Sequence, residues 1–246
     1  MKDFVEFKFN SVYSIADLTD DSIKGGAEFW NYNQALYISS ATKFSKFTLL
    51  HLYIITNCFN HYRRDFRKWG GFIDEEEIEY WYDLFNSYEI SYEEFEFEEN
   101  AEIFEWFEKH ETNFLELFEK MAEEVFYILF ANRGLLLEFN KLLHNTTIDV
   151  KIDAKCLTKK GTIKRVNIPS WVKKAVFHRD KGRCVFCNKD LTNIFNTLNN
   201  TNYDHMVPLD LMGVNDPTNL QLTCETCNKS KSNREESTGL NYIPWW

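Results

Sequence analysis

Two pairs of cysteines near the C-terminus constrain the fold of this 246-residue chain more strongly than any other feature. Each pair is separated by two residues: Cys184 precedes Cys187, and Cys224 precedes Cys227. Four thiolates in two such pairs are typical of a closed, tetrahedral structural zinc site. We therefore expect both pairs to fold around one Zn²⁺ ion rather than to form disulfides or a redox centre.

Polar residues of a second kind lie between and beside the cysteine pairs. Asp204 and His205 are adjacent, Asn219 follows them in the same interval, and Asn228 comes directly after the last cysteine. Carboxylate and amide oxygens bind hard divalent ions such as Mg²⁺ and Mn²⁺, which can activate water. An imidazole with an ordinary pKa near ~6.5 can accept a proton from such a water near neutral pH. The interval therefore predicts a metal-dependent hydrolase.

Residues 169–234 resemble the HNH endonucleases, one branch of the His-Me finger (ββα-metal) nucleases. The spacing is similar to that of the family, because thirteen residues separate His205 from Asn219 and eight separate Asn219 from Asn228. The resemblance rests on five ordered segments, which are Arg179-Asp180, Cys184-Val185-Phe186-Cys187, Asp204-His205, Asn219-Leu220 and Cys224-Glu225-Thr226-Cys227-Asn228.

This resemblance implies a role for each motif residue. His205 would be the general base, and Asp204 and Asn228 would hold a catalytic Mg²⁺ or Mn²⁺ ion. Asn219 would tie the loop backbone so that the histidine is aimed. Many members carry His where this chain has Asn228, and the neutral amide makes Zn²⁺ a poorer fit as the catalytic ion. Nearby cations are expected to contact phosphates or to be solvated helix charges, namely Lys229, Lys231 and Arg234.

The net charge of −10 conceals two parts of opposite sign. Residues 1–150 hold 13 Lys and Arg against 29 Asp and Glu, whereas residues 151–246 hold 15 against 9. A basic part that carries the candidate site indicates a polyanionic substrate. The acidic part is expected to bind a protein partner, or to cover its own basic neighbour until a signal releases it.

These patterns predict an α+β protein with an α-helical N-terminal domain followed by a small ββα-metal domain with a structural zinc. We place the first domain at 1–150 and the HNH nuclease domain at 151–246, and we find no phosphate-binding loop or dinucleotide motif in the first. Ser170 is expected to cap a helix, and residues 159–162 to form a turn between short strands. Apolar spacing predicts helices over 34–64, 74–85, 100–110, 111–130, 135–143 and 170–179.

The remaining features concern location and association. No apolar run is long enough to cross a bilayer, the N-terminus lacks a signal-peptide pattern, and four of six cysteines suit metal binding, so we expect a cytoplasmic protein. The C-terminal residues Pro244-Trp245-Trp246 are expected to pack on a core or on a partner. The sequence leaves a homo-oligomer open.

The expected function is endonuclease cleavage of double-stranded DNA. By analogy, we expect an accessory effector in bacterial or phage conflict, such as antiphage defence, because an unregulated nuclease damages its own cell. Three alternatives stay open: a ribonuclease or single-strand nuclease of the same fold, a zinc-stabilised nucleic-acid-binding module without catalysis, and a scaffold that acts through its helical domain.

Overall fold

The computed structural model describes residues 6–29, 33–68, 75–94, 102–193, 201–233 and 235–243. The chain divides into two compact units that interleave along the sequence. The first comprises Met1–Ser22, Phe29–Asn31 and Tyr53–Ile128, and the second comprises Ile23–Glu28, Tyr32–Leu52 and Leu129–Trp246. The second unit therefore contains the four paired cysteines together with two stretches from the N-terminal half.

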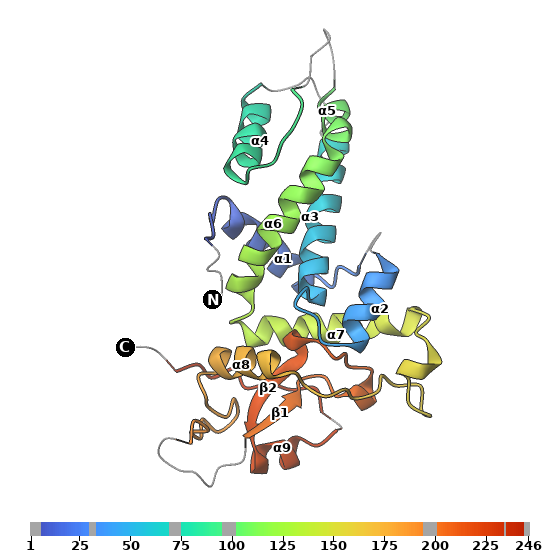
Figure 1. The fold of residues 1–246 in the computed structure, drawn as a ribbon, viewed down its shortest axis with the longest axis vertical. Coiled ribbons are helices and arrows are strands. Elements are labelled where there is room, and N and C mark those ends of the chain that lie inside the picture. The colour runs from blue at the N-terminus through green and yellow to red at the C-terminus, as the bar shows by residue number, and fades with distance from the viewer. Residues whose placement is uncertain are drawn as a thin grey trace. The chain divides into compact units, whose positions relative to one another are not determined.

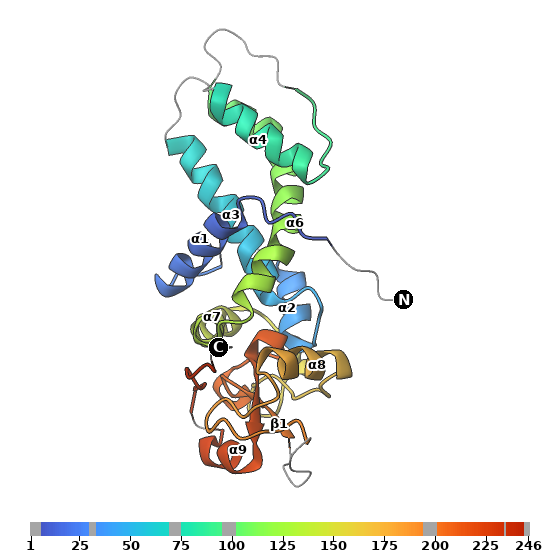
Figure 2. The ribbon, with the colours of Figure 1, turned by 90° about the vertical axis from the view of Figure 1, so that its left-hand side faces the viewer.

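The first unit is helical and has an aromatic core. Its long helices α3 and α6 lie side by side (Figures 1 and 2). Aromatic rings from four helices meet between them. The ring centroid of Phe114 on α6 lies 4.9 Å from that of Trp81 on α4 and 4.7 Å from that of Phe107 on α5. The helices of this unit are α1 (Val12–Lys24), α3 (Leu49–Lys68), α4 (Glu75–Ser87), α5 (Ile103–Lys109) and α6 (Glu111–Leu129), of which α1, α3 and α6 end or begin in the second unit.

The second unit is built around a two-stranded antiparallel sheet. Strand β1 (Thr201–His205) pairs with β2 (Leu220–Cys224), so that Asp204 faces Gln221 and His205 faces Leu220. Helix α9 (Glu225–Lys231) follows β2 directly and contacts both strands. This is the expected ββα arrangement, and with the helical first unit it confirms the α+β class. The other elements are helices α2 (Gln34–Thr42), α7 (Arg133–Asp149) and α8 (Ser170–Arg179), and 3₁₀ turns η1 (Ala154–Cys156), η2 (Leu209–Leu211) and η3 (Pro217–Asn219).

Helix α8 packs against the sheet through a small apolar core. Val172 and Val176 of α8 are fully buried with Leu220 and Leu222 of β2. At the end of the helix, the carboxylate of Asp180 accepts two hydrogen bonds from the Arg179 guanidinium and one from the backbone N–H of Leu222. These contacts fix α8 on the strand that leads into the second cysteine pair.

Several local predictions hold, and others fail because of contacts distant in sequence. Helices α4, α5, α6 and α8 lie within a few residues of their predicted ranges, whereas α1 was not predicted. The predicted helix over 34–64 is wrong, because α3 starts anew at Leu49, whose N–H is capped by Asp216 at 2.9 Å. Ser170 does not cap α8, since Pro169 occupies that position.

Helix α7 continues six residues beyond its predicted end at 143. Thr147 Oγ1 donates to the carbonyl of Leu143 and lies 2.9 Å from the hydroxyl of Tyr37 on α2. This contact between α2 and α7 stabilises a last turn whose β-branched residues do not favour a helix by themselves.

No helix in the described ranges combines the length and hydropathy that a bilayer crossing requires. The C-terminal residues Pro244-Trp245-Trp246, which are expected to pack on a core or on a partner, lie outside the described residues.

Candidate active site and zinc site

The four paired cysteines converge in the second unit. Their Sγ atoms all lie within 4.8 Å of one another, and Cys187 Sγ lies 3.7 Å from Cys224 Sγ. A tetrahedron of thiolates at the usual Zn–S length of about 2.3 Å has edges of about 3.8 Å. The second pair bridges β2 and α9, because Cys224 ends the strand and its Sγ accepts from the N–H of Cys227. The donor set therefore fits one tetrahedral Zn²⁺ ion.

Asn219 organises the long connection between β1 and β2. Its side chain is fully buried, its Oδ1 accepts from the N–H of Val207 at 2.8 Å, and its Nδ2 donates to the carbonyls of Val207 and Val214. The backbone carbonyl of Asn219 also accepts from the N–H of Met206. One amide side chain thus fixes the turn that begins directly after His205.

Asp204 is held by two buried donors on a single oxygen. Its Oδ2 accepts from Gln221 Nε2 at 3.0 Å and lies 3.1 Å from Lys231 Nζ. The Gln221 amide also donates to the carbonyl of Ser237. Because both donors use Oδ2, the orientation of the carboxylate is fixed while Oδ1 stays available to a further ligand.

His205 ends β1 and is almost fully buried, with 2 % of its surface exposed. Neither ring nitrogen has a hydrogen-bond partner that meets normal geometry. Burial, together with the positive charges of Arg165 and Lys231, lowers the pKa of His205 to about 3, although the Asn215 side chain opposes the shift. The imidazole is therefore neutral near neutral pH, which is the form that can accept a proton.

Asp204 and His205 line one pocket of about 160 Å³. Asp210 and Asn233 form its rim and are joined by a hydrogen bond of 3.2 Å. The remaining lining residues come from the stretch before α8 and from the turn after β1, namely Thr158, Thr162, Ile163, Arg165, Pro208 and Leu209. Two hard carboxylates and an imidazole therefore share a small polar cavity.

The other residues singled out from the sequence have different surroundings. Asn228 is half-buried on α9 and is not among the residues that line the pocket. Lys229 is exposed and pairs with Glu225 on the same helix. Lys231, expected to contact phosphate, is instead buried, and its Nζ donates to the carbonyl of His205 at 2.8 Å. Arg234 lies outside the described residues.

Helices α3 and α7 hold the connection between β1 and β2 in place. Asp216 is fully buried, and its carboxylate accepts from the first N–H of α3 and from the N–H and hydroxyl of Thr218. Burial raises the pKa of the Asp216 carboxyl, while these hydrogen bonds oppose the rise. Asn140 of α7 donates to the Thr218 hydroxyl at 3.3 Å. Sequence reasoning missed these residues because they act through tertiary contacts.

A model of the HNH endonuclease family matches residues 184–234. The C-terminal region contains an HNH domain. The family match does not extend to residues 1–183. No curated protein and no solved structure shows significant similarity to the chain.

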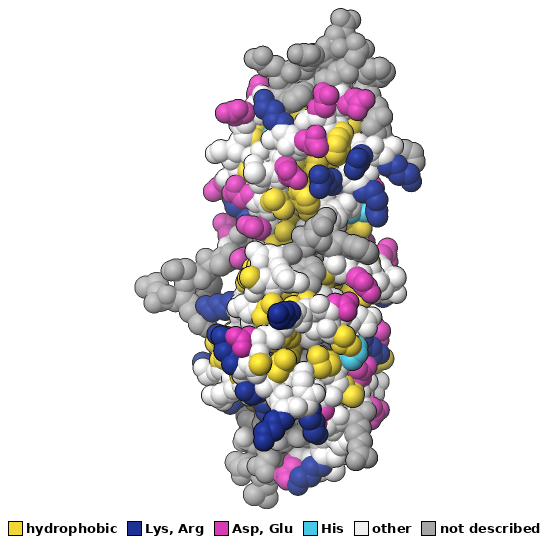
Figure 3. Space-filling view, turned by 90° about the vertical axis from the view of Figure 1, so that its right-hand side faces the viewer, with side chains coloured by type: hydrophobic (Ala, Val, Ile, Leu, Met, Phe, Trp, Pro, Cys, Tyr) yellow, Lys and Arg dark blue, Asp and Glu magenta, His cyan; other side chains and the backbone are white. Residues whose placement is uncertain are grey.

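The segment that matches the HNH model includes Asp204 and His205, which line the pocket, and also Asn219 and Asn228. Arg165 and the other pocket-lining residues before residue 184 lie outside the segment that the family model matches. The surface of the second unit is rich in cations: dark blue Lys and Arg side chains are spread over the lower part of Figure 3. The family match therefore supports a nuclease-type function for a domain with a cation-rich surface.

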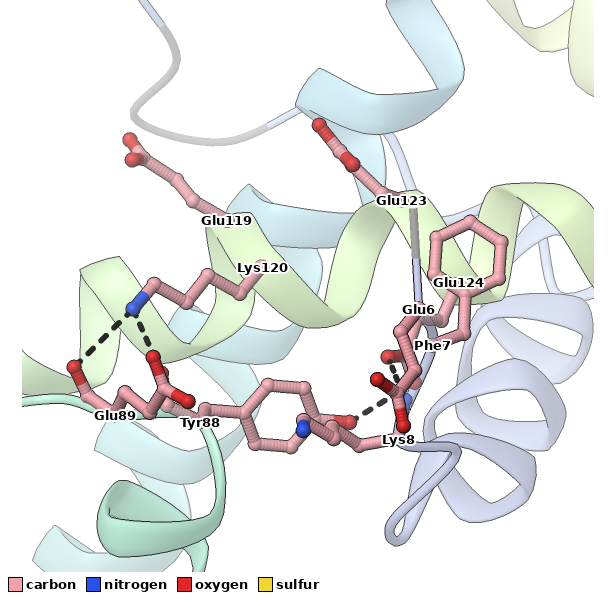
Figure 4. Close-up of a pocket in the computed structure, with 9 residues that line it drawn as sticks. All are labelled: Glu6, Phe7, Lys8, Tyr88, Glu89, Glu119, Lys120, Glu123 and Glu124. Atoms are coloured by element: carbon pink, nitrogen blue, oxygen red, sulfur yellow. Dashed lines mark hydrogen bonds between the residues drawn. The ribbon is translucent and has the colours of Figure 1, made fainter. Parts of the chain in front are cut away.

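The first unit contains a larger pocket of about 540 Å³. Figure 4 shows the N-terminal segment from Glu6 to Lys8 beside α6, with Glu124 joining them. The Glu124 carboxylate is buried and accepts from the N–H groups of Lys8 and Phe9 and from the Tyr88 hydroxyl. The rim is mainly acidic, with Glu6, Glu89, Glu119 and Glu123 against Lys8 and Lys120.

Proposed function

We propose that the protein is a metal-dependent endonuclease that hydrolyses phosphodiester bonds in double-stranded DNA. The observation that supports this most directly is the shared pocket of Asp204 and His205 at the end of β1, inside a domain matched to the HNH endonucleases. A carboxylate fixed through one oxygen and a neutral imidazole are the two groups that such hydrolysis requires.

In this proposal His205 accepts the proton of the attacking water. Asp204, through its Oδ1, and Asn228 would hold a hard divalent ion such as Mg²⁺ or Mn²⁺, because both offer oxygen donors. When bound, such an ion supplies positive charge that stabilises the leaving oxygen. Asn219 keeps the His205 end of β1 in place through its hydrogen bonds to the following loop. The cysteines hold a structural Zn²⁺ ion and have no part in the reaction.

The test is cleavage of supercoiled plasmid DNA by the purified full-length protein, with Mg²⁺, with Mn²⁺ and with EDTA. The proposal expects nicked and linear products with a divalent ion and none with EDTA. A parallel panel of single-stranded DNA and structured RNA identifies the substrate class. Cleavage of RNA alone would show that the substrate is RNA and not DNA, and the proposed phosphodiester hydrolysis would be retained.

One observation favours a second function, a zinc-stabilised nucleic-acid-binding module without catalysis. Both ring nitrogens of His205 are closed off from solvent, although a general base must reach a water molecule. This second function expects that the protein binds duplex DNA tightly in Mg²⁺ and leaves the plasmid intact. Binding and nicking measured on the same sample separate the two functions.

We also infer that residues 1–150 bind a protein partner that controls the nuclease, in a cytoplasmic role in bacterial or phage conflict. The acidic rim of the pocket in Figure 4 supports a partner with a basic surface. The double variant Glu119→Gln/Glu123→Gln should lose a partner that co-purifies with the wild type. The matched control Glu105→Gln/Glu108→Gln, which neutralises exposed residues of α5 outside that pocket, should retain it.

A further inference from the structure

A small hairpin forms one wall of the pocket that contains Asp204 and His205. Leu157 and Ile163 form an antiparallel bridge, and the N–H of Thr158 donates to the carbonyl of Thr162 at 2.8 Å. At the tip, Gly161 has a φ of +82°, a backbone conformation that suits glycine. We call residues 157–165 the basic hairpin. It precedes the residues that the HNH family model matches.

The basic hairpin is fixed to the site at its base. Ile163 is buried with 1 % exposed, and the N–H of Lys164 donates to the carbonyl of Cys156 at 2.9 Å. Asn215, which is fully buried in the connection between β1 and β2, donates to the carbonyl of Lys164 at 2.8 Å. The hairpin and the catalytic residues are therefore held by the same connecting loop.

Most of the positive charge of this segment is uncompensated. Residues 154–165 contain five Lys and Arg and no Asp or Glu. Lys155 pairs with Asp153 at 2.9 Å, and Lys164 Nζ donates to a backbone carbonyl. The remaining three cations are Lys159, Lys160 and Arg165. They are exposed and form no ion pair with any described acidic residue.

Arg165 connects this charge to the reaction. It lines the same pocket of about 160 Å³ as Asp204 and His205. A phosphodiester that enters the pocket to meet His205 therefore meets a guanidinium, whose planar donors suit phosphate oxygens.

We propose that the basic hairpin binds the DNA backbone at the cleavage site, with Arg165 on the phosphate that is attacked and Lys159 and Lys160 on phosphates of neighbouring nucleotides. This inference rests on the proposed nuclease function and names its substrate contacts. Contacts of this kind position the duplex but carry no base information, so the hairpin supplies affinity rather than sequence preference.

The first test measures binding of a labelled DNA duplex to the full-length protein in EDTA at several salt concentrations. Each lost phosphate contact lowers the slope of log affinity against log salt by about 0.9, so Lys159→Gln/Lys160→Gln should lower it by about 2. Raising salt from about 50 to about 200 mM should then weaken wild-type binding about tenfold more than variant binding. The control is Lys173→Gln/Lys174→Gln, which removes two exposed lysines of α8 and should keep the wild-type slope.

The second test measures plasmid nicking by Arg165→Gln and Arg165→Lys. Loss of a donor aimed at the reacting phosphate lowers kcat by about 100-fold, and Lys should restore part of it. Zinc content and melting temperature establish that each variant is folded. A wild type that neither binds nor nicks DNA would overturn both this inference and the proposed function. If the wild type binds and nicks DNA, and the hairpin variants match the α8 control in salt slope and nicking rate, only the role of the basic hairpin is overturned.

Discussion

Lys231 and Asp204 form an ion pair inside the HNH domain, with 3.1 Å between Nζ and Oδ2. The same ammonium donates to the backbone carbonyl of His205, and only 3 % of the Lys231 side chain is exposed. The last residue of α9 therefore holds two consecutive residues of β1. A lysine that the sequence suggests as a solvent-facing phosphate contact instead joins the helix to the strand that carries Asp204 and His205.

Removing this ammonium should destabilise the protein. Lys231→Met leaves the Asp204 carboxylate, whose side chain is 15 % exposed, without its cation. We expect a loss near the lower end for a broken buried pair, about 3 kcal/mol, which corresponds to a fall in melting temperature of about 6–12 °C. Lys229→Met on the exposed face of α9 serves as the control and should leave the melting temperature within about 2 °C. Equal melting temperatures for both variants would show that the pair does not stabilise the fold.

Asn219→Ala should lower both stability and activity. The substitution leaves an N–H of Val207 and carbonyls of Val207 and Val214 without their buried partner, at about 1–3 kcal/mol for each unsatisfied group. Because the cysteines are untouched, the zinc content should stay at the wild-type value while plasmid nicking falls. Asn167→Ala, an exposed position, is the control for melting temperature. Unchanged nicking by Asn219→Ala would contradict a role in aiming His205.

The cysteine cluster should bind one zinc ion per chain, and the fold of the second unit should depend on it. Cys187→Ser removes one of four convergent thiols and should lose the metal, measured by elemental analysis of the purified protein. Structural zinc contributes directly to folding, so the melting temperature should fall in parallel. Cys156→Ser changes a cysteine outside the cluster and should retain full zinc content. Zinc retained by Cys187→Ser would exclude the four-thiolate site.

Acid should destabilise the fold through His51 in α3. Burial lowers the pKa of His51 to about 4, and its Nδ1 lies 3.1 Å from the backbone N–H and 2.8 Å from the hydroxyl of Thr48. A lowered folded-state pKa gives stability that is present above the unfolded value of ~6.5 and is lost as pH falls toward about 4. Between pH ~7 and ~4.5 this amounts to about 2–3 kcal/mol.

The measurement is the free energy of unfolding of the wild type and of His51→Gln at both pH values. The variant should lose less stability than the wild type on acidification, because it has no proton to bind at this position. His205 is present in both proteins, so its own titration cancels in the comparison. An identical pH dependence would show that His51 does not contribute.

The convergence of the paired cysteines was predictable from the sequence, whereas the contacts that support the site were not. Spacing alone predicted that Cys184, Cys187, Cys224 and Cys227 converge, and their Sγ atoms do lie close enough together to hold one metal ion. The pairing of Asp204 with Lys231 and Gln221, and the capping of α3 by Asp216, depend on residues brought together only by the fold. Arg165 lies in the basic part of the sequence, residues 151–246, but no local pattern indicated that it reaches the pocket.

The division of labour between residues 1–150 and 151–246 stays a prediction. The two compact units do not divide the chain at residue 150, because residues 32–52 and 129–150 group with the HNH domain. Apolar periodicity identifies helices but not the unit that each helix joins, since that choice depends on long-range packing. Truncations intended to isolate the nuclease should therefore retain α2 and α7.

The most direct test of the account compares nicking of supercoiled plasmid by the wild type and by His205→Ala, under single-turnover conditions in Mg²⁺ or Mn²⁺. The account predicts that His205→Ala retains zinc and duplex affinity and nicks at least about 100-fold more slowly, the usual contribution of a general base. Equal rates for the two folded, zinc-loaded proteins would contradict the assignment of His205 and of the pocket around it.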